Sequence, residues 1–358
     1  MSLTISTPGR NASIDNIKAV LIFLVVFGHL FETYVGNDHF LRSIWIFVYS
    51  FHMPMFALVS GMFSKPLLDE RQTGQLLKNI VIPLVGFELL YEGTEFLLKG
   101  NVSVYANLVA PYWMLWYLLS LLCWRLLLPL FARMQFPVML ALALSLAAGY
   151  SEHAGYFLSL SRTLIFFPYF LLGWKIGPDA VLAKKNNLLL VSLPLVGLAI
   201  VASFLLKPNF DYRWLYGSYS LHRLEMANLS GTLYQGLQYL ISTAVGLSVL
   251  HVLTRKDLGL ARIGQRSMYV FLWHGMALIA LQESGLLRRI FAMEDAAALL
   301  ISLSITAAIV WLSSHPRCEQ LTQKCLLHPL AWLLTRQTGQ SLAPKSGELH
   351  DQPAQLEP

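Results

Sequence analysis

Ten runs of predominantly apolar residues follow one another along the chain, separated by short polar stretches. A helix needs about 20 such residues to cross the hydrocarbon core of a bilayer. We expect membrane-spanning helices at 14–35, 43–63, 75–98, 111–131, 136–151, 161–177, 188–206, 231–253, 266–284 and 297–314. The fifth run is short, and the third contains glutamates. The pattern therefore predicts an all-α polytopic membrane protein with about ten transmembrane helices.

The last part of the sequence breaks this pattern. Residues 336–358 are rich in Pro, Ser, Gln and charge and have no apolar period, which is typical of disorder. We expect one transmembrane domain over 1–335, followed by a disordered polar C-terminal tail over 336–358. No internal repeat is visible, which counts weakly against the duplicated halves of many secondary transporters.

The composition agrees with a membrane protein. The chain is 56% hydrophobic and 13% charged, with a mean hydropathy of +0.55. A soluble domain carries roughly a quarter charged residues, so these values exclude a cytosolic enzyme, a secreted enzyme and a nucleic-acid-binding domain. In a membrane protein, the positions of the basic residues behind the net charge of +6 indicate topology. With an even number of helices, most lysines and arginines lie on the same side of the membrane as the N-terminus. We expect both termini in the cytoplasm. The three cysteines lack metal-ligand spacing, and we expect no metal site.

The first apolar run contains three ionisable residues, Asp15, Lys18 and His29. Such residues are costly in a membrane span and normally face a cavity or a partner. Lys18 and His29 are about three helical turns apart, so they share a face with roughly 16 Å of rise between them. An imidazole can take a proton from a hydroxyl, and a cation one leaflet away can hold the phosphates of a donor such as coenzyme A. Alternatively, Lys18 reaches the headgroups with Asp15 as its partner, and His29 bonds a neighbouring helix.

The second run contains His52 two residues before Pro54, with Ser60 and Gly61 further on. Proline frees a backbone carbonyl and bends a helix, and small residues allow another helix to approach closely. We expect either a kinked helix beside a cavity, or a packing kink with His52 hydrogen-bonded across it.

The third run contains an acidic stripe, because Glu88, Glu92 and Glu95 fall at i, i+4 and i+7. Three ionised carboxylates cannot face lipid. Either they line a wet cavity, or the helix leaves the membrane before the stripe, which is then solvated.

An aromatic stretch lies between the seventh and eighth runs, where Phe210, Tyr212, Trp214 and Tyr216 alternate with polar residues. Aromatic faces beside polar groups suit sugar rings, and the same residues also populate membrane interfaces. Both interpretations stay open.

Six segments, taken together, carry a recognisable order of motifs. They are RNASIDNIKAVLIFLVVFGH (10–29), FHMPMFALVSG (51–61), LLKNIVIP (76–83), YWMLWYLLSLLCWRLLLP (112–129), SRTLIFFPYFLLGW (161–174) and GQRSMYVFLWHG (264–275). This series resembles the acyltransferase 3 family of integral membrane acyltransferases, above all its fucose 4-O-acetylase-like branch. The third segment departs from the family in having few arginines.

The resemblance implies about ten helices, a cytoplasmic N-terminus, and transfer of an acyl group to sugar hydroxyls beyond the membrane. The resemblance and the polar positions together select nine candidate site residues. They are His29, Asp15 and His52 for catalysis, Arg10, Lys18 and Lys78 for binding the donor, and Arg162, Glu88 and Trp116 on the acceptor side. In this hypothesis Asp15 orients Lys18, and His52 bonds either the thioester oxygen or His29.

We therefore expect an O-acetyltransferase in a bacterial inner membrane. It moves acetyl from cytoplasmic acetyl-CoA, a co-substrate and not a tightly bound cofactor, to a hydroxyl of a cell-surface or exported saccharide or glycolipid. A transporter or flippase of a lipid-linked saccharide is the alternative, and a non-catalytic partner of a polysaccharide synthase is a third possibility. Only the ordered segments favour the enzyme.

Overall fold

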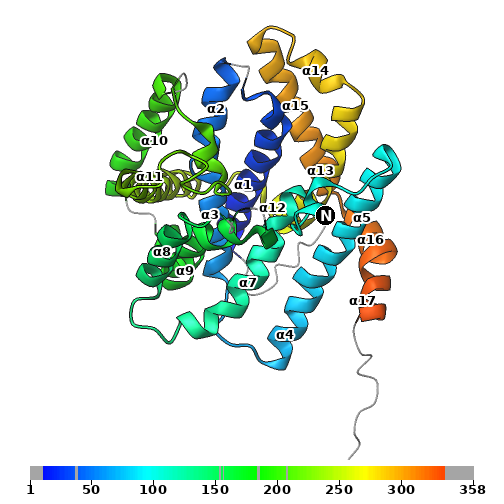
Figure 1. Cartoon of the computed structure of the whole chain (residues 1–358), viewed down its shortest axis with the longest axis horizontal. Helices are drawn as coiled ribbons and strands as arrows, with labels where there is room; N and C mark the ends of the chain where they lie inside the picture. The colour runs from blue at the N-terminus through cyan, green and yellow to red at the C-terminus, as the bar shows by residue number, and fades with distance from the viewer. Residues whose placement is uncertain are drawn as a thin grey trace, which may run out of the picture.

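The computed structural model of the chain describes residues 11–36, 39–152, 155, 157–183, 186–206 and 209–334. The described part is a bundle of α-helices joined by short 3-10 and π-helical turns, and it contains no β-strand (Figure 1). Arg10 and the predicted tail over 336–358 lie outside the described residues.

Each predicted span coincides with helical structure, within a few residues at most ends. The corresponding helices are α1 (Ala12–Leu30), α2 and α3 (His39–Tyr49 and His52–Met62), α5 (Ile82–Lys99), α7 (Trp116–Phe131), α8 (Pro137–Ala148), α9 (Leu160–Leu182), α10 (Asn186–Leu206), α11 (Leu229–Leu253), α13 (Ser267–Glu283) and α15 (Asp295–Ser313). The shorter elements are η1 (Glu32–Tyr34), α4 (Glu70–Leu76), η2 (Leu77–Val81), α6 (Val104–Asn107), η3 (Trp113–Leu115), η4 (Phe157–Ser159), η5 (Tyr212–Tyr216), α12 (Ala261–Gln265), α14 (Leu286–Ile290), α16 (Pro316–Thr322), η6 (Gln323–Leu327) and α17 (His328–Leu334).

Seven helical segments in the described part are long and apolar enough to cross a membrane. The other predicted spans are helices with less suitable properties: α5 carries three glutamates, α8 has 12 residues and α13 has 17. The prediction of an all-α polytopic membrane protein is confirmed, while the count of ten and the cytoplasmic termini stay predictions.

The second predicted span is kinked as expected, and the kink lies just before His52, with a hydrogen bond from His52 to the Val48 carbonyl across it. The helix stops at Tyr49 and a new helix starts at His52. Pro54 falls in the first turn of α3, where its missing N–H has no intrahelical partner to lose. The break brings His52 to the start of α3.

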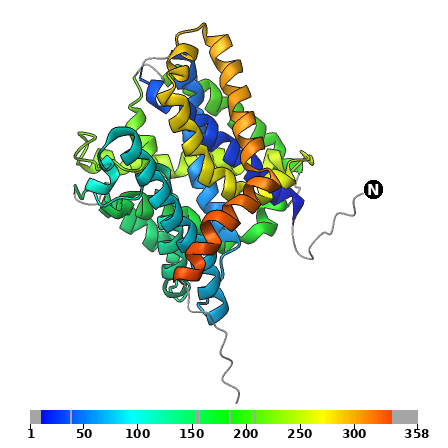
Figure 2. The same cartoon turned by 90° about the vertical axis from the view of Figure 1, so that its right-hand side faces the viewer.

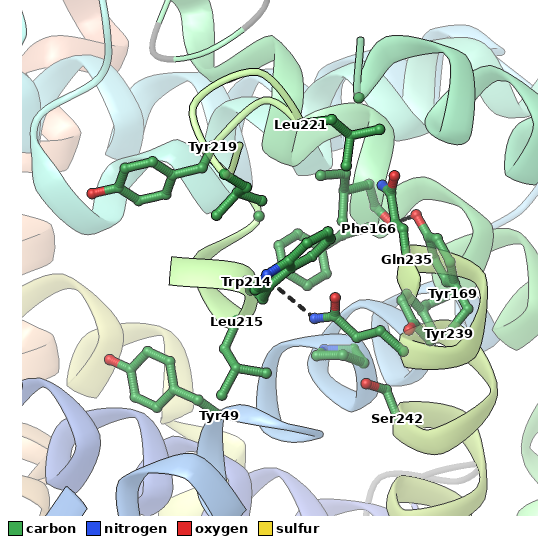
Figure 3. A pocket seen from close by; sticks show the side chains of 16 residues that line it. Tyr49, Phe166, Tyr169, Trp214, Leu215, Tyr219, Leu221, Gln235, Tyr239 and Ser242 are labelled. Carbon is green, nitrogen blue, oxygen red and sulfur yellow. Dashed lines mark hydrogen bonds between the residues drawn. The ribbon is translucent and has the colours of Figure 1, made fainter. Parts of the chain in front are cut away.

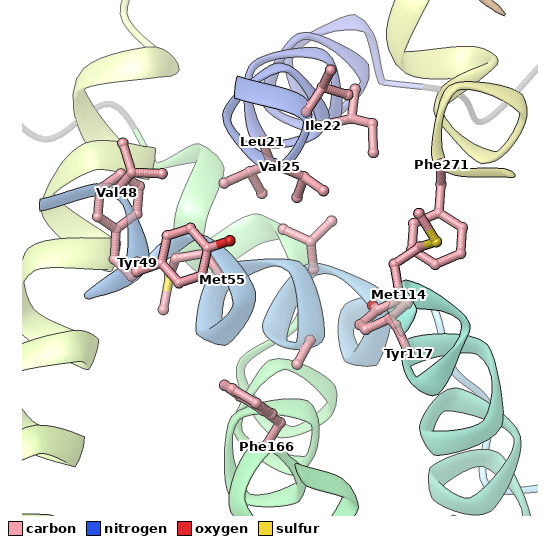
Figure 4. Packing of buried hydrophobic residues seen from close by; sticks show 14 of the residues in the cluster. Leu21, Ile22, Val25, Val48, Tyr49, Met55, Met114, Tyr117, Phe166 and Phe271 are labelled. Atoms are coloured by element: carbon pink, nitrogen blue, oxygen red, sulfur yellow. The ribbon is translucent and has the colours of Figure 1, made fainter. Parts of the chain in front are cut away.

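Helix α1 lies at the centre of the bundle. It contacts α2, α3, α11, α12, α13 and α15, and Figures 1 and 2 show it enclosed by them. Ile17, Leu21 and Ile22 have no exposed surface. In Figure 4, the side chains of Leu21, Ile22 and Val25 lie in the buried cluster beside α3. Because α1 is packed on several sides, the residues at its two ends are held at a fixed separation.

Two glycines permit the close crossing of α3 and α9. A Cβ atom on Gly61 would lie 1.9 Å from the Phe170 carbonyl oxygen, and one on Gly173 would lie 1.9 Å from the Leu58 carbonyl oxygen. Any side chain at either position would push the backbones apart, as expected for small residues at a membrane helix interface. This crossing places the start of α9 beside the start of α3.

Candidate active site

A cavity of about 230 Å³ lies where the C-terminal end of α1 meets the starts of α3, α7 and α9. Its lining combines ionisable and aromatic side chains with two aliphatic ones. The residues are His29, Glu32, Tyr49, His52, Met53, Tyr105, Trp113, Trp116, Arg162, Phe166, Tyr212, Leu215, Tyr216 and Tyr219. Four of the nine candidate site residues, His29, His52, Trp116 and Arg162, are brought together here.

His29 and Glu32 form a hydrogen-bonded pair across the end of α1. Nδ1 of His29 lies 2.7 Å from Oε2 of Glu32, and both side chains are mostly buried. A carboxylate only accepts hydrogen bonds, so Nδ1 carries the hydrogen and Nε2 keeps its lone pair. The Tyr49 hydroxyl lies 3.3 Å from the same Nδ1 atom. The arrangement prepares His29 to accept a proton at Nε2, as in other His–carboxylate pairs.

The charge of Glu32 is maintained by its neighbours. Burial raises the pKa of the Glu32 carboxyl, but His29, Arg162 and the Tyr216 hydroxyl outweigh it, so the pKa lies below its ordinary value. Glu32 therefore stays ionised at neutral pH and stabilises a proton on His29.

Arg162 and Trp116 form one wall of the cavity. The Arg162 guanidinium lies over the Trp116 ring at 5.1 Å, and its Nε donates to the Tyr216 carbonyl at 3.2 Å. These contacts fix a positive charge beside Glu32 and beside the aromatic segment predicted either to bind sugars or to lie in the interface.

His52 is oriented by the backbone of the preceding helix. Its Nδ1 lies 2.9 Å from the Val48 carbonyl oxygen, so Nδ1 is the donor and Nε2 of the neutral ring is an acceptor. The expected bond from His52 to a thioester oxygen is therefore not available to the neutral ring. An acceptor at this position suits a hydroxyl.

A third histidine, His274 of α13, packs against His29 at a ring-centroid distance of 5.7 Å. Its Nδ1 lies 2.7 Å from the Phe271 carbonyl oxygen, and its Nε2 is buried with no hydrogen-bond partner among the described residues. The segment 264–275, which contains His274, is one of the six that carry the family resemblance, but neither His274 nor Glu32 was among the predicted site residues. The i, i+3 spacing from His29 was the signal for Glu32.

The acidic stripe anchors the segment that leads to Trp113. Both carboxylate oxygens of Glu88 lie 3.0 Å from the Tyr112 backbone nitrogen, which donates to them. Glu92 accepts from Ser103, and Glu95 accepts from the Tyr112 hydroxyl. Glu88 is not among the residues that line the His29 cavity. Glu88, which was predicted to lie on the acceptor side, is therefore outside the cavity lining and anchors the backbone at Tyr112.

Trp113 directly follows the anchored residue Tyr112 and lines the His29 cavity. It has a φ of 36°, in the left-handed region that non-glycine residues rarely adopt. Its ring lies 5.2 Å from the His29 ring. The glutamate contacts hold this strained residue over His29.

A second cavity, of about 190 Å³, lies near the N-terminal end of α1 and is lined by Lys18, Ser60, Tyr117, Leu121 and Phe271 among others. Lys18 Nζ is 3.6 Å from Oδ1 of Asp15, whose side chain is 2% exposed and also accepts from Gln265. Asp15 thus contacts Lys18 and lies far from His29 along α1, which matches a role in orienting Lys18.

Lys78 is separate from this second cavity. It is exposed on η2 and is not among the residues that line the Lys18 cavity.

The two cavities approach one another along α3 and α7. On α3, Met53 lines the His29 cavity and Phe56 lines the Lys18 cavity. On α7, Trp116 lines the His29 cavity, and the next residue, Tyr117, lines the Lys18 cavity. One helical turn is about 5 Å, so only a thin layer separates the cavities. Figure 4 shows Met114, Tyr117 and Phe271 side by side in the buried cluster.

A smaller pocket of about 40 Å³ extends from the first cavity and shares Tyr49, Phe166, Leu215 and Tyr219 with it (Figure 3). Gln238 donates a hydrogen bond to the Trp214 carbonyl at 3.1 Å. The aromatic segment between α10 and α11 therefore contributes to the site itself.

Comparison with known proteins identifies the family. A sequence profile described as an acyltransferase domain matches residues 11–315. The nodulation protein NolL of Sinorhizobium fredii (strain NGR234) is 29% identical over 126 residues, and NolL of Mesorhizobium japonicum is 28% identical over 125 residues. Each match covers 31% of this chain and 34% of the relative, so the chain spans about a third of the length of these relatives. No solved structure matches the chain. The profile covers most of the chain, which therefore belongs to the acyltransferase 3 family of membrane acyltransferases.

Proposed function

We propose that this acyltransferase is an O-acetyltransferase of a bacterial inner membrane. It takes acetyl from acetyl-CoA on the cytoplasmic side and transfers it to a hydroxyl of a cell-surface or exported saccharide. The observation that supports this proposal is the pairing of two cavities along α1, one with Lys18 and the other with the His29–Glu32 pair.

The distance along α1 fits an acyl-CoA donor. An extended pantetheine arm reaches about 15 to 20 Å, and eleven helical residues rise roughly 16 Å. Phosphates held near Lys18 can therefore bring a thioester to His29, through the layer that contains Met114, Tyr117 and Phe271. The largely apolar walls of the Lys18 cavity suit the uncharged arm.

In the proposed step, Nε2 of His29 takes the proton of the saccharide hydroxyl as its oxygen forms a bond to the thioester carbonyl carbon. Glu32 stabilises the imidazolium and fixes its orientation. The C–S bond then breaks, and His29 returns the proton to the leaving thiolate, which gives the O-acetyl ester and free CoA. The Tyr49 hydroxyl and the Arg162 guanidinium are the donors we assign to the transient oxyanion.

The cavity also supports a small acyl group and a sugar. Its volume of about 230 Å³ lies near the lower end of small-molecule sites, so a long acyl chain has little room beside a sugar ring. The walls formed by Trp116, Tyr212 and Tyr216 offer apolar ring faces beside hydroxyls and a guanidinium.

Mass spectrometry of surface and secreted glycans tests this proposal. Cells would carry a deletion of the gene, the wild type or His29→Ala. We expect an increment of about 42 Da, the mass of acetyl replacing hydrogen, only with the wild type. Glycans that are acetylated in the deletion strain would contradict the proposal. Glycans that are missing from the surface and retained inside would instead support a transporter or flippase.

A further inference from the structure

Arg125 is an arginine inside a membrane-spanning helix, α7, for which the structure offers only neutral partners. Its guanidinium donates to Ser64 Oγ at 3.5 Å and to Gln72 Oε1 at 3.1 Å. Its Nε is buried with no hydrogen-bond partner, and no carboxylate lies within ion-pair distance among the residues that the structure describes.

This arrangement is costly for the protein alone. A half-buried guanidinium needs a counter-charge, and a membrane span normally supplies one or leads to a site that does. Arginine presents a planar set of donors that matches phosphate oxygens. An unsatisfied donor and an uncompensated charge on one side chain therefore point to an anionic ligand.

The position of Arg125 joins it to the Lys18 cavity. Leu118 and Leu121 of α7 line that cavity, and Arg125 follows on the same helical face, one turn further along. At the end of α3, Lys18 lies over the Phe63 ring at 5.1 Å, and Arg125 contacts the adjacent Ser64. The two cations thus flank the same end of α3, and Arg125 lies one helical turn beyond Leu121, outside the residues that line the cavity.

We propose that Arg125 and Lys18 together form a phosphate-binding site for the nucleotide part of the acyl donor, with Arg125 supplying the second cation. This inference rests on the proposed acetyl-CoA donor and names a residue that the sequence did not select. In this proposal Arg125 has the role in donor binding that was expected of Lys78. Lys78 lies exposed on η2.

Binding of CoA to the purified full chain tests the site. The other probes are dephospho-CoA, which lacks the 3′-phosphate, and pantetheine, which lacks all the phosphates together with the adenosine. The variants are Arg125→Gln and Arg125→Lys, and the control is Arg133→Gln, at an exposed position just beyond the same end of α7. We expect Arg125→Gln to raise the Kd for CoA about tenfold or more, since charged hydrogen bonds are involved. Arg125→Lys should recover part of the affinity, and Arg133→Gln should behave as wild type.

The probes separate a phosphate contact from a structural effect. If Arg125 binds phosphate, the wild type and Arg125→Gln should differ for CoA and become equal for pantetheine. An equal loss for all three probes, or no loss for CoA, would overturn the inference while leaving the proposed function intact. If the wild type binds none of them, the donor assignment in the proposed function fails.

A lipid phosphate is the other source of the same chemistry. We would therefore repeat the CoA measurement in nanodiscs of phosphatidylcholine alone and of phosphatidylcholine mixed with anionic phosphatidylglycerol. The inference requires that the tenfold difference between wild type and Arg125→Gln persists in both. A difference that appears only without phosphatidylglycerol would show that the lipid headgroup occupies Arg125, and would overturn the inference.

Discussion

The two cavities along α1 differ in how their charges are satisfied. In the His29 cavity, His29, Glu32 and Arg162 contact one another or nearby carbonyls and hydroxyls, so each of these ionisable groups has a partner without a substrate. At the Lys18 cavity, Arg125 has neutral partners and one unsatisfied donor. A complete network suits reacting groups that must be held in place, and an incomplete one suits a ligand that brings its own charge. This difference agrees with our proposal that the chemistry takes place at one end of α1 and that the donor binds at the other.

The largest effect should come from removing the proposed base. His29→Ala should lower kcat by about 10²- to 10⁴-fold, because the variant lacks the general base that is proposed to take the hydroxyl proton. The Kd for CoA should stay within a factor of two or so of wild type, since the phosphates bind at the other end of α1. Turnover is measured by release of free CoA thiol, and His328→Ala, at an exposed position on α17, is the control.

The comparison would break in either of two ways. Full activity in His29→Ala would remove His29 from the chemistry. A large loss of CoA affinity in the same variant would show that the two cavities do not act separately.

The next effect concerns the positioning residue, Glu32. Glu32→Gln keeps the size of the side chain and loses its charge, so the His29 imidazolium is less stable and kcat should fall by about 10²-fold. Because the pKa of Glu32 is below its ordinary value, the wild type keeps the carboxylate as pH falls from 8 to 6. The loss of kcat in Glu32→Gln should therefore be present at pH 8, where the wild-type carboxylate is ionised. An unchanged kcat in Glu32→Gln at pH 8 would show that the carboxylate does not act on His29.

The sequence predicted what lies within one helix better than what lies between helices. The apolar runs gave the helices, because length and hydropathy decide which segments can be buried in lipid. Lys18 and His29 could be placed on one face, since helical spacing is fixed. Asp15 and Lys18 were recognised as partners for the same reason, and the structure shows that contact.

The missed features depend on where the chain goes after a helix ends. Glu32 lies two residues beyond the end of α1 at Leu30, and its contact with His29 requires the η1 turn. His274 meets His29 only through the packing of α13 against α1. The acidic stripe was expected either to line a cavity or to be solvated. Glu95 lines a cavity of about 670 Å³ and pairs with Lys99, while Glu88 and Glu92 accept from residues 103–112. Of these contacts, only the one between His29 and Glu32 has a signal in the sequence, their i, i+3 spacing.

An intermediate effect is expected at the donor end. Lys18→Met alone would remove a partner of the buried Asp15 carboxylate, so Asp15→Asn with Lys18→Met is the better test, since it removes both charges. The double variant should raise the KM for acetyl-CoA about tenfold with kcat nearly unchanged, because a charged contact to phosphate is lost. Asp15→Asn alone is the control for folding. An unchanged KM in the double variant would remove Lys18 from the donor site.

The smallest effect is expected where the His29 cavity depends on a distant anchor. Glu88→Gln keeps one acceptor for the Tyr112 N–H and loses the charge, so the segment before Trp113 is held less firmly. A weakened charged hydrogen bond of about 1 kcal/mol corresponds to a few-fold change. We expect the KM for the saccharide to rise by that factor with the KM for acetyl-CoA unchanged, because Trp113 contacts His29 and does not line the Lys18 cavity. Glu294→Gln, at an exposed position before α15, is the matched control. A rise in the KM for acetyl-CoA instead would mean that the stripe acts on the donor side, and the division of labour between the two cavities would have to be redrawn.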